Sequence, residues 1–204
     1  MIELYTWGTP NGRKISIMLE ECGLPYSVRK VDISTGDQFA PEFVALNPNS
    51  KIPVIVDSEG PDGKPIALME SGAILVYLAG KTGKFLPQSA RGRYKALEWL
   101  MFQMGGVGPM FGQLHVFLRL AEPVPYALER YTKEKNRLYS VLDRRLAEVP
   151  YLAGEYSIAD IATFPWVARH DFHKTDLADY SNVKRWFDAI SARPAVARGM
   201  AVPS

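Results

Sequence analysis

The feature that most constrains the fold is a change of pattern along the chain. Strand-like runs alternate with helical stretches through about the first eighty residues, whereas strand signals disappear from Gly92 onward. The segment KFLPQSARG, with Pro87 near its centre, separates the two patterns and is typical of a linker. The sequence therefore predicts an α/β domain over residues 1–83, a linker over 84–92 and an all-helical domain over 93–204.

The first domain is expected to open with a strand–helix–strand unit. Apolar residues of its first helix recur at the spacing of one helix face, and Gly23-Leu24-Pro25 ends that helix. Two later apolar runs flank a loop of turn-forming residues, a pattern typical of a hairpin. The expected strands are 2–7, 26–33, 52–56 and 65–69, and the expected helices are 15–22, 38–46 and 73–83.

The second domain is expected to contain only helices. Gly105, Gly106, Gly108 and Pro109 interrupt the first of them and predict a kink. The sequence Ser157-Ile158-Ala159-Asp160 matches a helix-capping motif with Asp160 in place of the more usual Glu or Gln, so Asp160 is given a structural role. The expected helices are 94–120, 125–149, 157–169 and 183–191.

Composition excludes several classes of protein. The 204 residues include 24 Lys and Arg against 22 Asp and Glu, a net charge of +2 that is dispersed along the chain and does not indicate a nucleic-acid or membrane partner. The single cysteine, Cys22, cannot form an internal disulfide, which favours a reducing compartment. With no signal peptide evident and no apolar stretch near 20 residues, we expect a cytoplasmic protein.

The stretch GTPNGRK, residues 8–14, is the first candidate site. Thr9 is a preferred helix cap, and Pro10 suits the first position of a helix. A helix start carries unpaired N–H groups and the positive end of the helix dipole, so this one could stabilise an anion such as a thiolate. The alternative is that Asn11-Gly12 is only a hairpin turn.

Two further stretches are candidates for ligand binding. Pro53 enters a strand, so it is expected at the strand's first residue or at a sheet edge, or else in a cis bond that exposes the backbone of Ile52 to a ligand. Glu70 and Ser71 lie at a second helix start, which would suit a ligand that carries both an ammonium and a carboxylate group.

These pieces together resemble the cytosolic glutathione transferases, and the resemblance covers nearly the whole chain. It is carried by Lys51-Ile52-Pro53-Val54, by Glu70-Ser71 and by the helical second half. Within that family, Thr9-Pro10-Asn11, Gly36-Asp37-Gln38-Phe39 and the run from Gln103 to Met110 are similar to the bacterial Nu class, whose relatives include the yeast prion-forming nitrogen regulator. The resemblance implies a thioredoxin-like N-terminal domain, an all-α C-terminal domain and a homodimer.

The resemblance also implies roles for individual residues. Thr9 and Asn11 would be catalytic, because they can donate hydrogen bonds to the glutathione sulfur. Ile52 would pair through its backbone with the cysteinyl part of glutathione. Arg130 would reach the glutathione of the neighbouring subunit. The implied glutathione-binding residues are Thr9, Asn11, Gln38, Lys51, Ile52, Glu70, Ser71 and Arg130.

Departures from other branches of the superfamily bear on the mechanism. No cysteine occupies the first helix start, and Tyr5 is a weak candidate for a catalytic phenol. Cys22 lies on the apolar stripe of the first helix, where cysteines are usually inert. The redox sulfur would then come from glutathione itself. The expected activity is glutathione-dependent disulfide reduction, with weaker transferase and peroxidase activity, no metal, and a small disulfide or electrophile as second substrate.

Other functions remain open from the sequence. A conventional transferase would conjugate glutathione to electrophiles, with Met104, Met110, Phe111 and Phe117 lining a cleft, although such residues are equally expected in a core. A non-catalytic glutathione-binding module would have the same fold and would serve binding without catalysis. His170 and His173 have a spacing that a metal could use, but no third ligand is evident.

Overall fold

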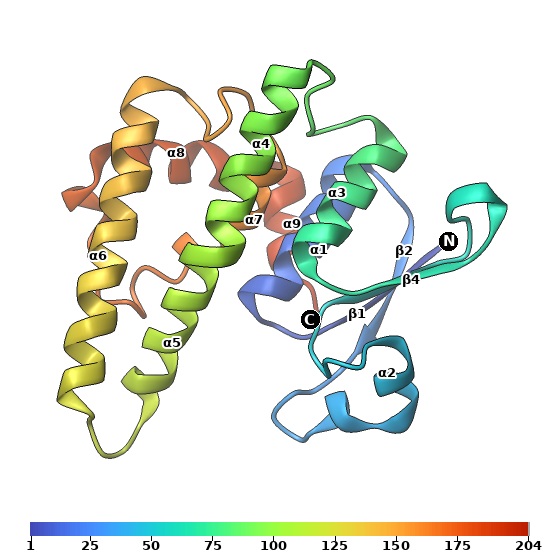
Figure 1. The fold of residues 1–204 in the computed structure, drawn as a ribbon, viewed down its shortest axis with the longest axis horizontal. Helices are drawn as coiled ribbons and strands as arrows, with labels where there is room; N and C mark the ends of the chain where they lie inside the picture. The colour runs from blue at the N-terminus through green and yellow to red at the C-terminus, as the bar shows by residue number, and fades with distance from the viewer. Residues whose placement is uncertain (204) are drawn as a thin grey trace. The chain divides into compact units, whose positions relative to one another are not determined.

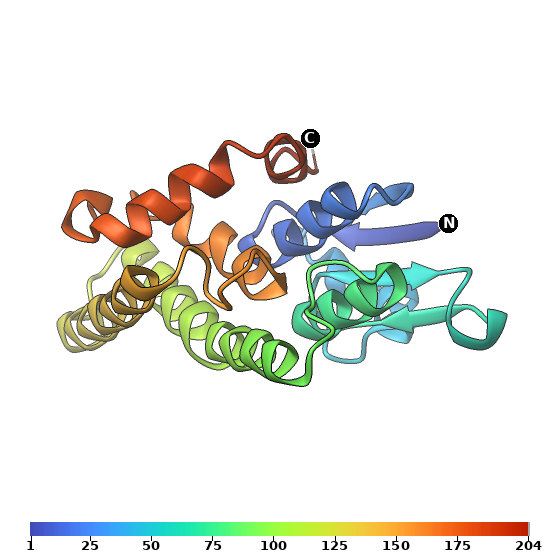
Figure 2. The ribbon, with the colours of Figure 1, turned by 90° about the horizontal axis from the view of Figure 1, so that it is seen from above.

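The structure, a computed structural model, describes residues 1–203 and divides into two compact units (Figures 1 and 2). One unit comprises Met1–Lys84 together with the C-terminal segment that begins at Arg193. The other comprises Phe85–Ala192 and is helical. Among the described residues, no helix is long and apolar enough to cross a membrane.

A four-stranded mixed sheet forms the centre of the first unit (Figure 1). Its strand order is β2-β1-β3-β4, with β1 and β2 parallel and the other neighbours antiparallel. The predicted hairpin is confirmed, because Val56 of β3 pairs with Ala67 of β4. The strands are β1 (Ile2–Thr6), β2 (Tyr26–Lys30), β3 (Val54–Asp57) and β4 (Ile66–Leu68).

The pleat of β1 sends alternate side chains to opposite faces of this sheet. Ile2, Leu4 and Thr6 are buried on one face. Tyr5 lies on the other face, where its ring packs against Phe43. The helices of this unit are α1 (Pro10–Cys22), α2 (Pro41–Leu46), α3 (Ser71–Thr82) and α9 (Pro194–Met200).

Helix α9 packs against α1, a pairing that the sequence did not indicate. The two backbones approach so closely at Gly199 that a Cβ there would lie 2.5 Å from the Cα of Ile17. The hydroxyl of Ser16 donates to the Gly199 carbonyl at 2.7 Å. Arg193 also forms a two-pronged ion pair with Glu21, whose side chain is largely buried. These contacts place the C-terminal segment with the first unit rather than with the helices that precede it in the chain.

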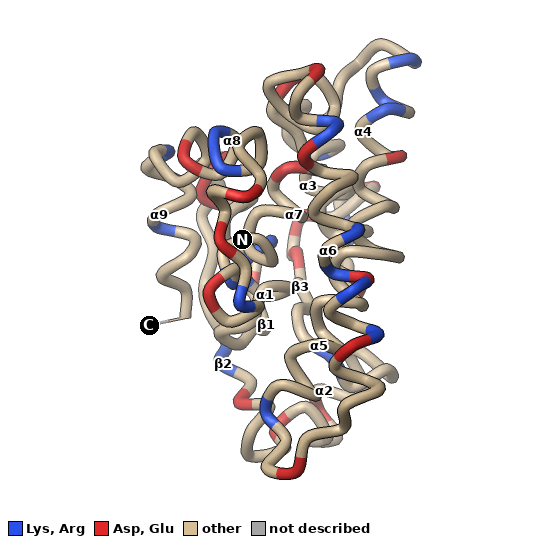
Figure 3. The backbone as a smooth tube through the Cα atoms, turned by 90° about the vertical axis from the view of Figure 1, so that its left-hand side faces the viewer, with Lys and Arg blue, Asp and Glu red and all other residues tan. Residues whose placement is uncertain are grey.

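The second unit is built from helices of which the longest is α6. The predicted first helix is present, but its glycine-rich part, Gln103–Val107, forms a π-helical turn between α4 and α5. Lys/Arg and Asp/Glu positions are interspersed along α6 (Figure 3). The helices are α4 (Ala90–Phe102), α5 (Gly108–Arg119), α6 (Pro125–Glu148), α7 (Ile158–Val167) and α8 (Ser181–Ser191).

The predicted capping motif at the start of α7 is confirmed. The Asp160 side chain accepts hydrogen bonds from the Ser157 amide at 3.0 Å and from the Ser157 hydroxyl at 3.2 Å. It also accepts from the amide of Leu152 at 2.9 Å and from the indole of Trp186 at 2.8 Å. Burial raises the pKa of Asp160 to about 6, while these donors act in the opposite direction. The residue therefore joins three segments of the second unit.

A buried polar cluster lies between α5, α6 and the segment after α7. The Nε2 atoms of His115 and His173 are 2.6 Å apart, and the two side chains are 8% and 2% exposed. The hydroxyl of Tyr139 lies 3.3 Å from Nδ1 of His173. Lys135, also buried, donates to the His173 carbonyl and to the hydroxyl of Thr175. His173 is therefore part of the core of this unit.

Candidate functional site

The start of α1 has the geometry that the sequence predicts. Thr9 is its cap in an extended conformation, and its Oγ1 accepts from the amide of Gly12 at 3.2 Å. Since a hydroxyl can accept and donate at the same time, Thr9 can still donate its own hydrogen to an anion bound at the helix N-terminus. Asn11 and Gly12 lie inside the helix, so the hairpin alternative is wrong.

Gly12 lets this helix start lie directly on the end of β1. A Cβ at position 12 would overlap the hydroxyl of Thr6 and the carbonyl of Trp7, and only glycine avoids that overlap. The amide of Thr9 donates to the same Trp7 carbonyl at 2.6 Å. The strand end and the first turn of the helix therefore hold Thr9 and Asn11 in a fixed place.

The start of α3 is the second part of the candidate site. Ser71 is the first residue of α3 and is 4% exposed, whereas Glu70 before it is exposed. Glu70 has φ 66° and ψ 108°, a conformation that costs roughly 1–3 kcal/mol for a residue other than glycine. Strain of this size is typical of binding sites, and it fixes the direction in which the Glu70 side chain leaves the backbone.

A buried lysine connects the two helix starts. Lys14, in the second turn of α1, is 1% exposed and donates from Nζ to the Ser71 Oγ at 3.2 Å. Sequence reasoning did not select it. The signal that could have found it is periodicity, because Lys14 shares a helix stripe with Met18 and Cys22, both of which are buried. A lysine on such a stripe must have a polar partner.

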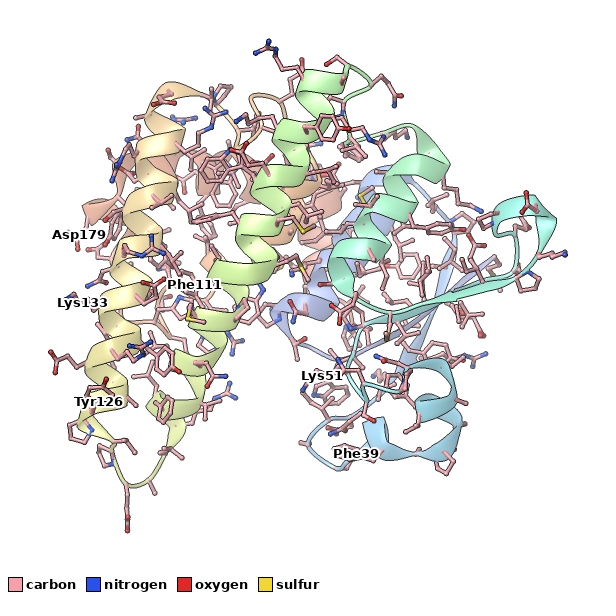
Figure 4. The ribbon with its side chains drawn as sticks, in the orientation of Figure 1. Phe39, Lys51, Phe111, Tyr126, Lys133 and Asp179 are labelled. Carbon is pink, nitrogen blue, oxygen red and sulfur yellow. The ribbon has the colours of Figure 1, made fainter. Side chains whose placement is uncertain are left out.

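The segment before β3 lies at the same end of the sheet, because Val54 at the start of β3 pairs with Tyr5 near the end of β1. The Ile52–Pro53 bond is cis, and Pro53 directly precedes the strand, as the sequence analysis considered. The carbonyl of Lys51 accepts from the side-chain amide of Asn47 at 2.7 Å. The Lys51 side chain is exposed (Figure 4).

Gln38 and Arg130 belong to different units of the structure. Gln38 belongs to the short 3-10 helix Asp37–Phe39, and its side-chain oxygen is buried without a hydrogen bond from the described residues. Phe39 next to it is exposed (Figure 4). Arg130 lies on α6 in the helical unit, where it lines a groove of about 670 Å³ together with Met110 and Tyr126. Within the first unit, Thr9 and Asn11 at the start of α1 are connected to Ser71 through the hydrogen bond of Lys14. Arg130 belongs to the other unit.

Tyr5 and Cys22 do not lie at the start of α1. The Tyr5 hydroxyl donates to Glu3 on the sheet face that carries α2, and burial raises the pKa of this phenol. Cys22 is at the far end of α1, with its sulfur 3.5 Å from the Thr82 hydroxyl. Burial also raises the pKa of the Cys22 thiol, which disfavours the thiolate.

Residues that the sequence analysis considered for other roles have local structural partners. Phe111 is fully buried and points from α5 toward α6 (Figure 4), where it stacks on Tyr139, so it is a core residue. Phe117 stacks on Tyr131. Within residues 1–203, no group of three or more His, Cys, Asp or Glu side chains is arranged to hold a metal ion.

Comparison with known families matches both units of the chain. The family described as glutathione S-transferase, N-terminal domain, matches residues 9–81. The family described as glutathione S-transferase, C-terminal domain, matches residues 110–194. Disulfide-bond oxidoreductase YfcG of Escherichia coli (strain K12) is 52% identical over 203 residues, which cover 98% of this chain and 94% of that protein.

Solved structures agree with this assignment. A glutathione transferase from Burkholderia graminis, with two glutathione molecules bound per subunit, is 52% identical with a TM-score of 0.96, covering 100% of this chain and 88% of that one. A glutathione transferase from Pseudomonas putida, with one glutathione disulfide bound per subunit, is 46% identical with a TM-score of 0.94, covering 100% and 92%. The chain therefore belongs to the glutathione transferase family, and its sheet-containing unit and helical unit are the two domains of that fold.

Proposed function

We propose that this protein is a glutathione-dependent disulfide-bond reductase in which bound glutathione supplies the thiol. The observation that carries the proposal is the start of α1, which offers the Thr9 hydroxyl and a helix N-terminus but no cysteine. The relatives support it, since one is named a disulfide-bond oxidoreductase and others hold two glutathiones or one glutathione disulfide. A bound glutathione disulfide holds two cysteinyl sulfurs together, as in the product of disulfide reduction by glutathione.

Stabilisation of the glutathione thiolate is the task assigned to Thr9 and Asn11. Each unit by which the site lowers the thiol pKa corresponds to about 1.36 kcal/mol of preference for the charged form. The Thr9 hydroxyl, the side chain of Asn11 and the positive end of α1 can each contribute to that preference. A thiolate held in this way is the nucleophile for disulfide exchange.

The remaining residues are assigned to the peptide part of glutathione. Glu70 would accept from the γ-glutamyl ammonium, and the buried Ser71 would donate to the γ-glutamyl carboxylate at the start of α3. Ile52 would pair with the cysteinyl backbone. Gln38 and Lys51 would bind the glycine carboxylate. For Gln38 this would use the side-chain NH₂ group, because a carboxylate only accepts hydrogen bonds.

The reaction proceeds by two exchanges. The bound glutathione thiolate attacks one sulfur of the substrate disulfide, which forms a mixed disulfide and releases the other sulfur as a thiolate that takes up a proton. A second glutathione thiolate then attacks the glutathione sulfur of the mixed disulfide. The products are glutathione disulfide and the second substrate thiol, so two glutathiones are oxidised for each disulfide reduced.

Asn11→Ala is expected to lower the rate of disulfide reduction at least about 10-fold, because one donor to the developing thiolate is lost. The measurement is reduction of a small symmetrical disulfide by glutathione, coupled to NADPH consumption through glutathione reductase. The ultraviolet absorbance of bound thiolate against pH should show a higher thiol pKa in the variant. The control is Asn136→Ala, an exposed asparagine on α6, which should keep the wild-type rate.

Two outcomes would redirect the assignment. Glutathione binding without disulfide turnover by the wild type, but with conjugation of electrophiles, would make the protein a conventional transferase. Binding without either activity would make it a glutathione-binding module. An Asn11→Ala variant as active as Asn136→Ala would remove Asn11 from the chemistry.

We also propose a homodimer in which Arg130 binds the glutathione of the partner subunit. Arg130 is exposed on α6 and lines a groove, which leaves its guanidinium accessible to a second chain. Sedimentation should give twice the 22.8 kDa mass of one chain. Arg130→Ala should weaken glutathione binding, whereas Arg144→Ala, which removes an exposed arginine of the same helix that does not line this groove, should not. A monomeric wild type that binds glutathione normally would contradict this arrangement.

A further inference from the structure

Asn47 is a buried polar residue at the C-terminal end of α2, where the loop toward β3 begins. It is 2% exposed, and its backbone amide donates to the Phe43 carbonyl at 2.9 Å, which makes it the residue that ends α2. Phe43, itself 3% exposed, packs with Val31 and Val54 in a small core cluster. The place of Asn47 is therefore fixed by the packing of α2 in the first unit.

Both polar atoms of the Asn47 side chain bond to the loop that follows. Its Oδ1 accepts from the amide of Asn49 at 2.9 Å, and its Nδ2 donates to the carbonyl of Lys51 at 2.7 Å. These two atoms cannot exchange places, because the N–H of Asn49 needs an acceptor and the carbonyl of Lys51 needs a donor. The side chain therefore holds the loop at two points in a single orientation.

The Lys51 carbonyl belongs to the same peptide unit as the N–H of Ile52. The bond between Lys51 and Ile52 is trans, so the carbonyl and the N–H lie in one plane and point in opposite directions. Because the side chain of Asn47 fixes the direction of the carbonyl, it also fixes the direction of the Ile52 N–H. That N–H points away from Asn47.

The Ile52 N–H has no hydrogen-bond acceptor among residues 1–203, which leaves it for a ligand. The antiparallel register places Val54 opposite Tyr5, and Ile52 therefore lies beside the residues that follow β1 and lead to Thr9. A ligand whose cysteinyl sulfur lies at the start of α1 can meet this N–H with its cysteinyl carbonyl, since an N–H bonds only to an acceptor.

We propose that Asn47 is a positioning residue for the cysteinyl carbonyl of glutathione, and that it acts by directing the Ile52 N–H toward that carbonyl. The inference rests on the proposed function, in which Ile52 pairs with the cysteinyl backbone. It adds a residue that does not touch the ligand, and it assigns the Ile52 N–H to one ligand atom. Loss of the Asn47 side chain should therefore weaken ligands that carry this carbonyl more than ligands that lack it.

A glutathione analogue separates this role from a general effect on the loop. In the analogue, an E-alkene replaces the peptide bond between the cysteinyl and glycyl residues. The cysteinyl carbonyl is then absent, while the thiol, the ammonium and both carboxylates are kept. Calorimetric titration of the wild type and of Asn47→Ala with glutathione and with the analogue gives their dissociation constants, and a merely structural role would weaken both ligands by the same factor.

Asn47→Ala is expected to weaken glutathione by about 3- to 10-fold, the size of one hydrogen bond between uncharged groups, because the Ile52 N–H loses its fixed direction. The same substitution should change the affinity for the alkene analogue by less than about 2-fold, since that ligand has no carbonyl for this N–H. Asn182→Ala is the matched control, because it also removes an asparagine whose Nδ2 donates, but to Asp143 in the helical unit. It should leave both affinities unchanged.

Equal weakening of the two ligands by Asn47→Ala, or no weakening of glutathione, would overturn the inference. If Asn47→Ala does not fold, Asn47→Asp is titrated in the same way at about pH 7.5, where an aspartate is ionised. It keeps the volume of the side chain and the acceptor for Asn49, whereas a carboxylate has no donor for the Lys51 carbonyl. It should then weaken glutathione selectively. Wild-type protein that binds no glutathione would instead overturn the proposed function, so the two failures are distinguishable.

Discussion

Asp160→Ala is expected to lower the free energy of unfolding by about 3–5 kcal/mol, the largest effect that we predict for a single side chain. Two costs combine. The start of α7 loses its capping box, worth about 1 kcal/mol. The buried amide of Leu152 and the indole of Trp186 lose their acceptor as well, and each unsatisfied buried donor costs about 1–3 kcal/mol.

Urea unfolding of the wild type, Asp160→Ala and Asp176→Ala measures this difference. Asp176 also accepts from an amide at a helix start, that of Ala178, but its side chain is exposed and, within residues 1–203, has no hydrogen bond to a second segment. Its loss should therefore cost about 1 kcal/mol or less. Equal costs for the two variants would mean that Asp160 is only a cap and that its bonds to Leu152 and Trp186 contribute nothing.

The start of α7 shows how much of this structure is readable from local sequence. A cap is decided by a few neighbouring residues, so Ser157 and Asp160 could be identified from their spacing alone. The same holds for Thr9 and Pro10 at α1, and for the hairpin of β3 and β4. What could not be read was the second half of the role of Asp160, because Trp186 lies 26 positions further along the chain.

Features that depend on long-range packing were missed for the same reason. Helix α9 is short, and its place against α1 is set by Gly199, Arg193 and Arg198, whose partners lie more than 170 positions earlier. Lys14 was passed over because a lysine in a helix is usually solvated. Its burial follows only once α1 and α3 are placed together.

The candidate site also has a part that local sequence predicts and a part that it does not. Thr9, Asn11, Glu70 and Ser71 could be proposed because helix starts have a chemistry that is visible in sequence. Their shared ligand could not be derived from those helix starts and came from a family resemblance, which the comparisons support. The role of Arg130 depends on a second chain, so neither the sequence nor the structure of one chain decides it.

The pairing of His115 with His173 could not be predicted from local sequence either, because 58 positions separate the two residues. From the sequence, His170 and His173 show only a spacing that a metal could use, with no third ligand evident. In the structure, His170 instead lies close to the carbonyl of Thr175, with its Nδ1 3.2 Å away. A buried histidine pair makes stability depend on pH, and this dependence is the second large effect that we predict.

Acidification below pH 6.5 is expected to destabilise the helical unit steeply. Burial lowers the pKa of His115 to about 4 and that of His173 to about 3, and the positive charges of Arg169, Arg119 and Lys135 act in the same direction. Histidines in the unfolded chain, with a pKa near 6.5, bind protons at pH values where the folded pair stays neutral. The free energy of unfolding therefore falls as the pH falls. Two such groups give a slope of about 2.7 kcal/mol per pH unit near pH 5. Asp160, whose pKa burial raises to about 6, offsets about half of this slope, because the folded carboxyl binds a proton there that the unfolded carboxyl has released.

Urea unfolding at several values between pH 7 and pH 4 tests this slope, with variants separating the histidines from the carboxylates that titrate nearby. His115→Asn should remove about half of the histidine contribution, because one titrating ring is lost while a polar side chain can still face His173. Asn136→Ala, at an exposed position on α6 that does not titrate, is the control outside the pair and should keep the wild-type slope. A slope that His115→Asn leaves unchanged would mean that the pair takes up its protons in the folded protein. The hydrogen bond argues against that outcome, because two rings that both carry hydrogen on Nε2 cannot lie 2.6 Å apart.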